Sequence, residues 1–427
     1  MRVLVLGSGA REHALAARLS IDRDVGELLA APGNPGIARL ARTAKVNLDD
    51  LDAVSALADR EQIDLTVVGP ELPLSLGIAD RFAEEGRLLF GPTAAAARLE
   101  SSKAFAKAFM ARHGVPTARF RVCASLDEAI AAVRAEEFGA PVVLKADGLA
   151  AGKGVVVAPD RAAAERAVLD AMRDRKFGAA GETVVIEECL QGPEVSFFCI
   201  CDGTRAVPIG TAQDHKRIFD DDRGPNTGGM GAFAPSPLAD AVLEARVMRE
   251  IVDPVVAGMA AEGHPFRGFL YAGLMLTPDG PKVIEFNVRL GDPEAQVVLP
   301  LIDEPLLPLL VAGATGRLTQ RSIRRGADRL AAVVLASRGY PESSESGREI
   351  VGIEAAEAIP QVSVFHAGTA LAGGRLVTAG GRVLTVVGRG LDYPEAIARA
   401  YVAALKISFD GVQFRHDIGR KAFAYET

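Results

Sequence analysis

The first hundred residues alternate between short apolar runs and helix-like segments, and this alternation constrains the fold more than any other feature. Apolar runs at Val3–Leu6, Ile63–Val68 and Leu88–Phe90 have the length of strands, and helical patterns lie between them. Strands that alternate with helices predict a parallel, doubly wound sheet. Ligands of such a sheet bind beyond the carboxyl ends of its strands. The turns Gly7–Glu12, after Val3–Leu6, and Ala31–Asn34, after a further strand at Glu27–Ala31, fall at such ends.

Length and boundary signals predict more than one domain. The chain has 427 residues, which exceeds one ordinary domain, so we expect several compact units. We expect an α/β domain at 1–102 and a central domain at 103–327, which includes a small α+β module at 123–188. The last unit, 328–427, carries several strand patterns and is expected to be a separate β-rich domain.

Start and stop signals place several helices within these units. Ser125 and Glu128 have the spacing of a capping box, which opens a helix expected to run to about Glu137. Further helices are expected at Ser102–His113, over residues 161–174, and from Asp392 to about Ile407.

Composition excludes several classes of function. Hydrophobic residues make up 49% and charged residues 24%, which is typical of a globular chain. A net charge of −7 gives no general basic surface, so we expect no nucleic-acid partner. No apolar run approaches the roughly 20 residues that span a bilayer, and the N-terminus turns polar too early for a signal peptide. We therefore expect a monomeric cytoplasmic protein without a membrane partner, in which Cys199 and Cys201 are small core residues.

Charges and glycines are concentrated in the stretch from Gln213 to Pro237. The stretch contains the basic side chains His215, Lys216, Arg217 and Arg223 beside acids, followed by glycines at 224, 228, 229 and 231. Glycine lets backbone N–H groups approach a ligand, and the cations suit phosphate or carboxylate groups. A long solvated loop is the alternative, but a second polar cluster at 285–289 favours a small-molecule site.

Lys145 ends an apolar strand pattern and is followed by a glycine-rich loop that contains Gly152 and Gly154. This arrangement suits polyphosphate, because the lysine neutralises phosphate oxygens while backbone N–H groups close over them. It is not a Walker A motif, since the lysine precedes the glycines. A solvated surface lysine is the alternative.

Two further patterns involve acids. Glu187, Leu190 and Glu194 can hold the two polar ends of an adenosine around an apolar hinge, although ion-paired strand ends explain the pattern equally well. Glu285 and Asn287 lie two apart on an expected strand, so their side chains share a face. Two oxygen ligands beside a triphosphate suit Mg²⁺; a buried ion pair between glutamate and Arg289 is the alternative.

Six segments, in chain order, resemble the phosphoribosylamine–glycine ligase family of the ATP-grasp superfamily. They are GSGAREHA at 7–14, APGN at 31–34, GPE at 69–71, KADGLAAGKGV at 145–155, RGPNTGGMGAFAPSP at 223–237 and NVRLGDPE at 287–294. The sequence departs from the family's usual pattern in having Leu290 in place of Phe and Ala10 in place of a frequent Gly. It also lacks a metal-binding acid on the 271–275 segment, so only Glu285 and Asn287 are carried over as metal ligands.

The resemblance implies an ATP-grasp central domain in which 123–188 is a mobile lid. It implies ligation of glycine to 5-phosphoribosylamine with ATP, through a glycyl phosphate, in purine biosynthesis with Mg²⁺ or Mn²⁺. The implied ATP-binding residues are Lys103, Lys145, Gly152, Gly154, Glu187, Leu190 and Glu194. Charge and position add the catalytic candidates Arg289, Asp214 and Lys216. The candidates for the sugar phosphate are Gly9, Arg11, Gly33, Asn34, Asn226 and Thr227.

Three other functions are considered. A Rossmann NAD-dependent oxidoreductase is suggested by Gly7 and Gly9, but Glu12 stands where the fingerprint needs glycine, and the strand Glu27–Ala31 ends without a ribose-binding acid. An inactive nucleotide-binding protein is disfavoured by the intact polar clusters. A biotin-dependent carboxylase would differ in having a bicarbonate-dependent ATPase activity.

Overall fold

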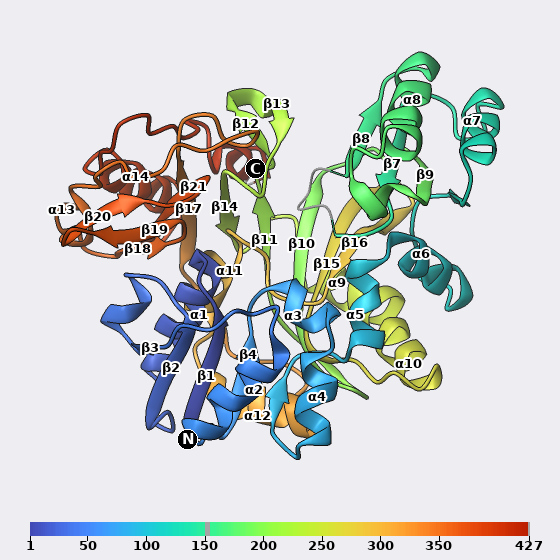
Figure 1. The fold of residues 1–427 in the computed structure, drawn as a ribbon. Helices are drawn as coiled ribbons and strands as arrows, with labels where there is room; N and C mark the ends of the chain where they lie inside the picture. The colour runs from blue at the N-terminus through green and yellow to red at the C-terminus, as the bar shows by residue number, and fades with distance from the viewer. Residues whose placement is uncertain (150–153, 426–427) are drawn as a thin grey trace.

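The N-terminal strands form the predicted parallel sheet. The computed structural model describes residues 1–149 and 154–425, and its first sheet has the order β3-β2-β1-β4-β5 with every pair parallel. The doubly wound class is therefore confirmed (Figure 1). The strands are β1 (Arg2–Gly7), β2 (Glu27–Pro32), β3 (Arg42–Thr43), β4 (Leu65–Val68) and β5 (Leu89–Phe90).

Helices cover both faces of this sheet, and its central strand β1 is buried from Val3 to Gly7. Val3 and Val5 of β1 pack with α1 (Ala10–Ser20) on one face. Leu4 and Leu6 pack on the other face with α2 (Leu51–Arg60) and α4 (Ile78–Glu84). A strand that is buried on both faces is typical of a parallel sheet.

A second sheet of eight antiparallel strands runs through the middle of the molecule in the order β16-β15-β10-β11-β14-β17-β21-β18. The C-terminal region is β-rich, as expected, but its strands are not detached. They extend the central sheet, because β14 pairs with β17 from Gly231↔Val333 to Ala234↔Leu330. The strands are β10 (Glu194–Asp202), β11 (Ala206–Asp214), β14 (Gly231–Ala234), β15 (Arg267–Thr277), β16 (Gly280–Asn287), β17 (Arg329–Ala336), β18 (Val362–His366) and β21 (Arg382–Gly390).

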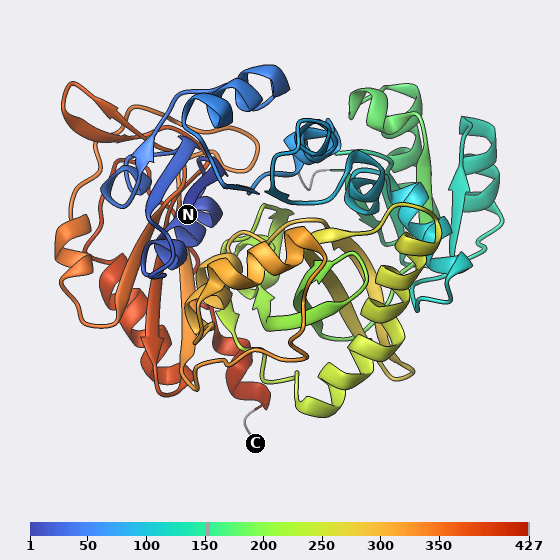
Figure 2. The same cartoon turned by 90° about the horizontal axis from the view of Figure 1, so that it is seen from below.

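The expected α+β module forms a smaller body with its own sheet and core. Its strands, in the order β6-β9-β7-β8, are β6 (Phe120–Cys123), β7 (Val142–Ala146), β8 (Val155–Ala158) and β9 (Val184–Glu188). Cys123, Leu144 and Ile186 belong to a hydrophobic cluster separate from those of the body. Figures 1 and 2 both place this module, here called the lid, at the end of the molecule opposite the C-terminal strands.

Helix ends differ slightly from the sequence expectations. Ser125 caps α7 (Leu126–Arg134), which ends three residues before Glu137. The helix expected over 161–174 is α8 (Arg161–Val168) followed by a π-helical turn, Leu169–Arg173. The other helices are α3 (Glu71–Ser75), α5 (Ala94–Ser101), α6 (Lys103–Arg112), α9 (Ala241–Val247), α10 (Asp253–Ala261), α11 (Ala295–Val298), α12 (Leu306–Thr315), α13 (Ile353–Glu357) and α14 (Tyr393–Ala404).

Two short hairpins complete the fold. The first joins β12 (Arg217–Phe219) to β13 (Arg223–Asn226), and the second joins β19 (Thr369–Ala372) to β20 (Arg375–Thr378).

Cys199 and Cys201 are free thiols in the core, as expected. Among the helices of the described residues, none has the length and apolarity needed to cross a membrane.

Candidate functional site

A cavity of about 930 Å³ lies between the lid, β16 and the turns that follow β11. Most of the predicted site residues line it: Arg11, Lys103, Lys145, Gly154, Glu187, Leu190, Glu194, Asp214, Lys216, Asn226, Thr227, Glu285, Asn287 and Arg289. Within the part of the chain that the structure describes, Gly9, Gly33 and Asn34 do not line this cavity. Gly152 lies outside the described residues.

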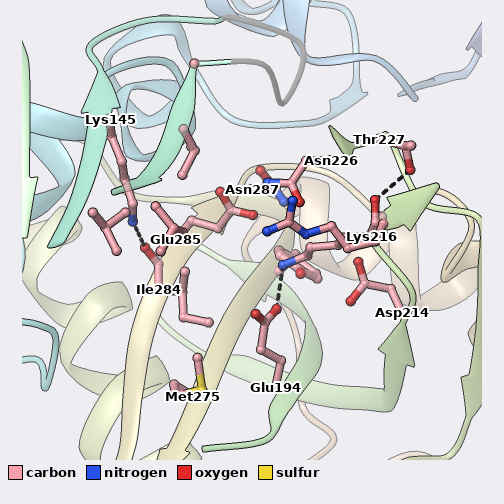
Figure 3. Close-up of a pocket in the computed structure, with 18 of the residues that line it drawn as sticks. Lys145, Glu194, Asp214, Lys216, Asn226, Thr227, Met275, Ile284, Glu285 and Asn287 are labelled. Carbon is pink, nitrogen blue, oxygen red and sulfur yellow. Dashed lines mark hydrogen bonds and ion pairs between the residues drawn. The ribbon is translucent and has the colours of Figure 1, made fainter. Parts of the chain in front are cut away.

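Glu285 and Asn287 enter the cavity from β16. They are two apart on this strand, so both side chains lie on one face, as predicted (Figure 3). Burial acts to raise the pKa of Glu285, but the charges of Lys216, Lys103 and Lys145 outweigh it and hold that pKa below its ordinary value. Glu285 is therefore ionised at neutral pH.

These two side chains fit a divalent cation. With the Asn287 amide turned to the orientation that its neighbours favour, its nitrogen donates to Glu100 Oε1 (3.2 Å) and Phe286 O (3.2 Å), and its carbonyl oxygen is left for a ligand. In the described ranges, no group of three His, Cys, Asp or Glu side chains has a metal-binding arrangement. A cation held by Glu285 and Asn287 would therefore take its remaining oxygens from substrate and water.

Lys145 and Glu187 are buried together at the base of the lid. Lys145 Nζ donates to Ile284 O at 2.8 Å (Figure 3). It also lies 3.1 Å from Glu187 Oε1. The other oxygen of Glu187 lies 2.8 Å from Lys107 Nζ. Glu187 is therefore an ion-paired residue at the end of a strand, which was the alternative to a role in binding adenosine. Sequence reasoning missed Lys107, although it follows Lys103 by one helical turn of α6.

Lys216 lies among carboxylates on the opposite wall of the cavity. Its Nζ is 2.7 Å from Glu194 Oε2 and faces Asp214 (Figure 3). Burial acts to lower the pKa of Lys216, but Glu194 and Asp214 outweigh it and hold that pKa well above its ordinary value. Burial raises the pKa of Asp214, and Lys216 opposes this shift while Glu194 adds to it.

Glu294 lies near Asp214 and Lys216, and sequence reasoning assigned it no role. It is buried, and Ser196 Oγ donates to its Oε1 (3.3 Å). Burial first, and the charge of Asp214 second, raise the pKa of Glu294 to about 7. Glu294 is the last residue of the NVRLGDPE motif at 287–294. Its place in that motif is the sequence feature that could have pointed to it.

Arg289 reaches the cavity from the segment after β16, but its charge is already shared. Its Nη2 lies 2.8 Å from Glu100 Oε1, and its Nε lies 3.3 Å from Glu71 Oε2. A buried pairing of Arg289 with glutamate does occur, with these two acids. Glu71 belongs to the quoted GPE segment, whereas nothing in the sequence singled out Glu100 on α5.

The turn after β1, where an anion site is expected, holds the Glu12 carboxylate close to its glycines. The Gly9 N–H donates to Glu12 Oε2 (2.6 Å), and a side chain at Gly7 or Gly69 would collide with the Glu12 carboxyl group. Asn34 is buried, its amide nitrogen donating to Ser8 O and His366 O at 2.8 Å each. The Glu12 carboxylate therefore takes up the Gly9 N–H, and a phosphate site at this turn stays a prediction. Arg11 alone of the N-terminal candidates lines the cavity.

His215 also differs from the expectation. The sequence grouped it with the cations of the 213–237 stretch, but its side chain is buried beside Phe233. Burial first, and the charges of Lys421 and Arg415 second, lower the pKa of His215 to about 3. It is therefore a neutral core residue at physiological pH.

Comparison with known proteins identifies the family of the chain. Three domains of phosphoribosylglycinamide synthetase match the chain: the N domain at residues 1–100, the ATP-grasp (A) domain at 101–295 and the C domain at 330–421. The phosphoribosylamine–glycine ligase of Xylella fastidiosa (strain Temecula1) is 52% identical over 430 residues, covering 100% of this chain and 99% of that protein. The enzyme of that name from Mesorhizobium japonicum is 51% identical over 426 residues, with 100% and 99% covered.

A solved structure gives the same assignment. The crystal structure of phosphoribosylamine–glycine ligase from Thermotoga maritima matches with a TM-score of 0.84 and 34% identity, covering 98% of this chain and 100% of that one. The biotin carboxylase domain of Hydrogenobacter thermophilus 2-oxoglutarate carboxylase, solved with MgADP and bicarbonate, matches with a TM-score of 0.73 over 96% and 91% of the two chains. At 19% identity, that likeness concerns the fold alone. The chain belongs to the phosphoribosylglycinamide synthetase family.

Proposed function

We propose that this chain ligates glycine to 5-phosphoribosylamine in an ATP-dependent reaction of purine biosynthesis, giving glycinamide ribonucleotide, ADP and phosphate. Family membership over the whole chain supports the proposal. The observation that carries it is the convergence of Lys103, Lys145, Glu285 and Asn287 on one cavity. We expect the enzyme to act as a cytoplasmic monomer.

The chemistry requires activation of glycine before an amide can form. A carboxylate is a poor electrophile at neutral pH, so we propose that glycine is first phosphorylated to glycyl phosphate. Phosphoryl transfer depends mainly on alignment and charge neutralisation. Lys103 and Lys145 would hold the nucleotide phosphates, while the segment from Leu190 to Glu194 would hold adenine and ribose. A divalent cation, Mg²⁺ or Mn²⁺, held by Glu285 and Asn287 would neutralise phosphate charge.

We place the sugar phosphate near Arg217. Most basic side chains of the cavity are already paired with carboxylates. In the described part of the chain, Lys103 and Arg217 are the cavity-lining cations without an ion pair. Arg217 Nη1 donates to Gly224 O (2.7 Å), which leaves the rest of its guanidinium for a phosphate. Asn226, its partner across the β12–β13 hairpin, and Thr227 line the same part of the cavity.

Omission of each substrate tests the reaction. We expect ADP release to require ATP, glycine and phosphoribosylamine together, with glycinamide ribonucleotide formed in equal amount. ADP release that depends on bicarbonate and not on glycine would refute the proposal in favour of a carboxylase.

Isotope labelling tests the intermediate. If the glycine carboxylate attacks the γ-phosphorus, one carboxylate oxygen leaves with the phosphate. Glycine labelled with ¹⁸O in its carboxylate should therefore yield labelled phosphate. Unlabelled phosphate would exclude glycyl phosphate while leaving the overall ligation intact.

A further inference from the structure

Three buried charged side chains meet where the lid joins the body. Lys107 on α6, Lys145 on β7 and Glu187 on β9 are 2%, 3% and 3% exposed. Each oxygen of the Glu187 carboxylate faces one lysine, Oε2 with Lys107 Nζ at 2.8 Å and Oε1 with Lys145 Nζ at 3.1 Å. Only Lys145 and Glu187 line the cavity; among the described residues, Lys107 lies behind them.

Lys107 is fixed in place by the body of the protein. Its Nζ also donates to Thr117 Oγ1 (2.7 Å), and that hydroxyl donates to Val283 O (2.7 Å). The ammonium therefore has a hydrogen-bonded position that is independent of the lid strand. Burial lowers the pKa of Lys107 to about 8, with the charge of Glu187 opposing the shift. Lys107 thus remains mostly protonated at neutral pH.

The charges of the three groups do not cancel. Two ammonium groups and one carboxylate leave a net charge of +1, because Glu187 is shared between both lysines. Lys145 Nζ donates one hydrogen bond, to Ile284 O, and its ion pair with Glu187 leaves N–H donors for a ligand. Without Lys107, Glu187 and Lys145 would form a neutral buried pair, whose attraction for phosphate would be much weaker.

We propose that Lys107 is a positioning residue that keeps Lys145 available to the nucleotide phosphates by neutralising Glu187 from behind. The inference rests on the nucleotide site proposed above. Lys107 touches no ligand and acts only through the shared carboxylate. Removing the ammonium should therefore weaken phosphate binding, and removing the carboxylate as well should restore it.

Binding of a non-hydrolysable ATP analogue, measured by calorimetry, tests this charge balance. We expect Lys107→Met to raise Kd at least tenfold while the KM for glycine stays within twofold of the wild-type value. The double variant Lys107→Met/Glu187→Gln should return Kd to within about threefold of wild type, since the net charge is again +1. Inorganic tripolyphosphate serves as a second probe. Its Kd should rank the variants in the same order, because it measures binding of the phosphate groups without adenine.

The pH profile gives a readout that a purely structural role would not change. The charged groups facing Lys107 are Glu187, Lys145 and Glu188. Deprotonation of Lys107 should raise the wild-type Kd as pH rises through about 8. Lys107→Met should lack this inflection, and Lys107→Arg should keep tight binding at high pH.

Controls separate the possible outcomes. Lys176→Met removes an exposed lysine of the lid that pairs with Asp170 at 3.6 Å, and it should bind the analogue like wild type.

If Lys107→Met binds within twofold of wild type while Lys145→Met binds weakly, the inference is refuted and the nucleotide site stands. If Lys145→Met binds normally, both fail. If Lys107→Met does not fold, the double variant decides: wild-type affinity supports the inference and tenfold weaker binding overturns it.

Discussion

Glu100 holds Arg289 at the wall of the cavity. One carboxylate oxygen lies 2.8 Å from Arg289 Nη2, and the other accepts a hydrogen bond from the Val288 N–H at 2.8 Å. Because the same carboxylate contacts both the side chain and the backbone of this segment, the guanidinium has a fixed position. Arg289 therefore meets a ligand as a preorganised cation, which is the arrangement that stabilises developing negative charge.

Replacing Arg289 should uncouple the two halves of the reaction. With Arg289→Met we expect turnover to fall about 100-fold, the KM for glycine to rise, and more ATP to be hydrolysed without product. The ratio of ADP to glycinamide ribonucleotide measures this directly. An unchanged ratio with an unchanged KM for glycine would reduce Arg289 to a structural partner of Glu100 and Glu71.

Replacing Glu285 should weaken cation binding and turnover while the fold is kept. Glu285→Ala removes a ligand oxygen beside the triphosphate, so we expect activity to fall by at least about 100-fold. Binding of Mn²⁺ in the presence of ADP, followed by electron paramagnetic resonance, should weaken in parallel. Asp279→Ala is the control, since that acid is exposed in the turn before β16. Activity within a few-fold of wild type would contradict the metal assignment.

Arg217 should affect the sugar substrate alone. We expect Arg217→Met to raise the KM for phosphoribosylamine roughly tenfold, the loss of about one charged phosphate contact. The KM values for ATP and glycine should stay within twofold. Arg223→Met, an exposed arginine of the same hairpin paired with Asp221 at 3.7 Å, is the matched control. Equal effects of the two substitutions would place the sugar phosphate elsewhere.

The lid should be the region whose protection depends most on nucleotide. Its core is separate from those of the body, and the cavity that ATP must enter lies beneath it. Hydrogen exchange over 123–188 should be fastest without ligand and slow markedly with an ATP analogue. Equal protection in the two states would argue against a gating role.

Glu294 should make stability depend on pH. Its pKa is raised from 4.5 to about 7 in the folded state, so the folded protein binds the proton more tightly than the unfolded chain. Its contribution is fully present below pH 4.5 and is lost as pH rises through about 7. We expect the free energy of unfolding of wild type to fall by on the order of 1–3 kcal/mol relative to Glu294→Gln over this range. Parallel stability curves for the two proteins would show that Glu294 titrates normally.

Local sequence determined the elements and the chemical character of the site. Alternation of apolar runs with helical segments predicts the parallel sheet, because each strand between helices must be apolar on both faces. The period of a strand likewise places Glu285 and Asn287 on one face. Motif resemblance was enough to identify the family, and most of the site residues proposed from the sequence line the cavity.

Tertiary structure alone decided which charges are free. Glu12 fills the turn beside Gly9, Glu100 holds Arg289, and Lys107 shares Glu187 with Lys145. Glu100 and Arg289 are 189 residues apart, so no local pattern can reveal their contact. The same holds for the continuity of the sheet through β14 and β17. Charge, burial and pKa are properties of the assembled neighbourhood, because the cost of burying an ion depends on partners that only the complete fold brings together.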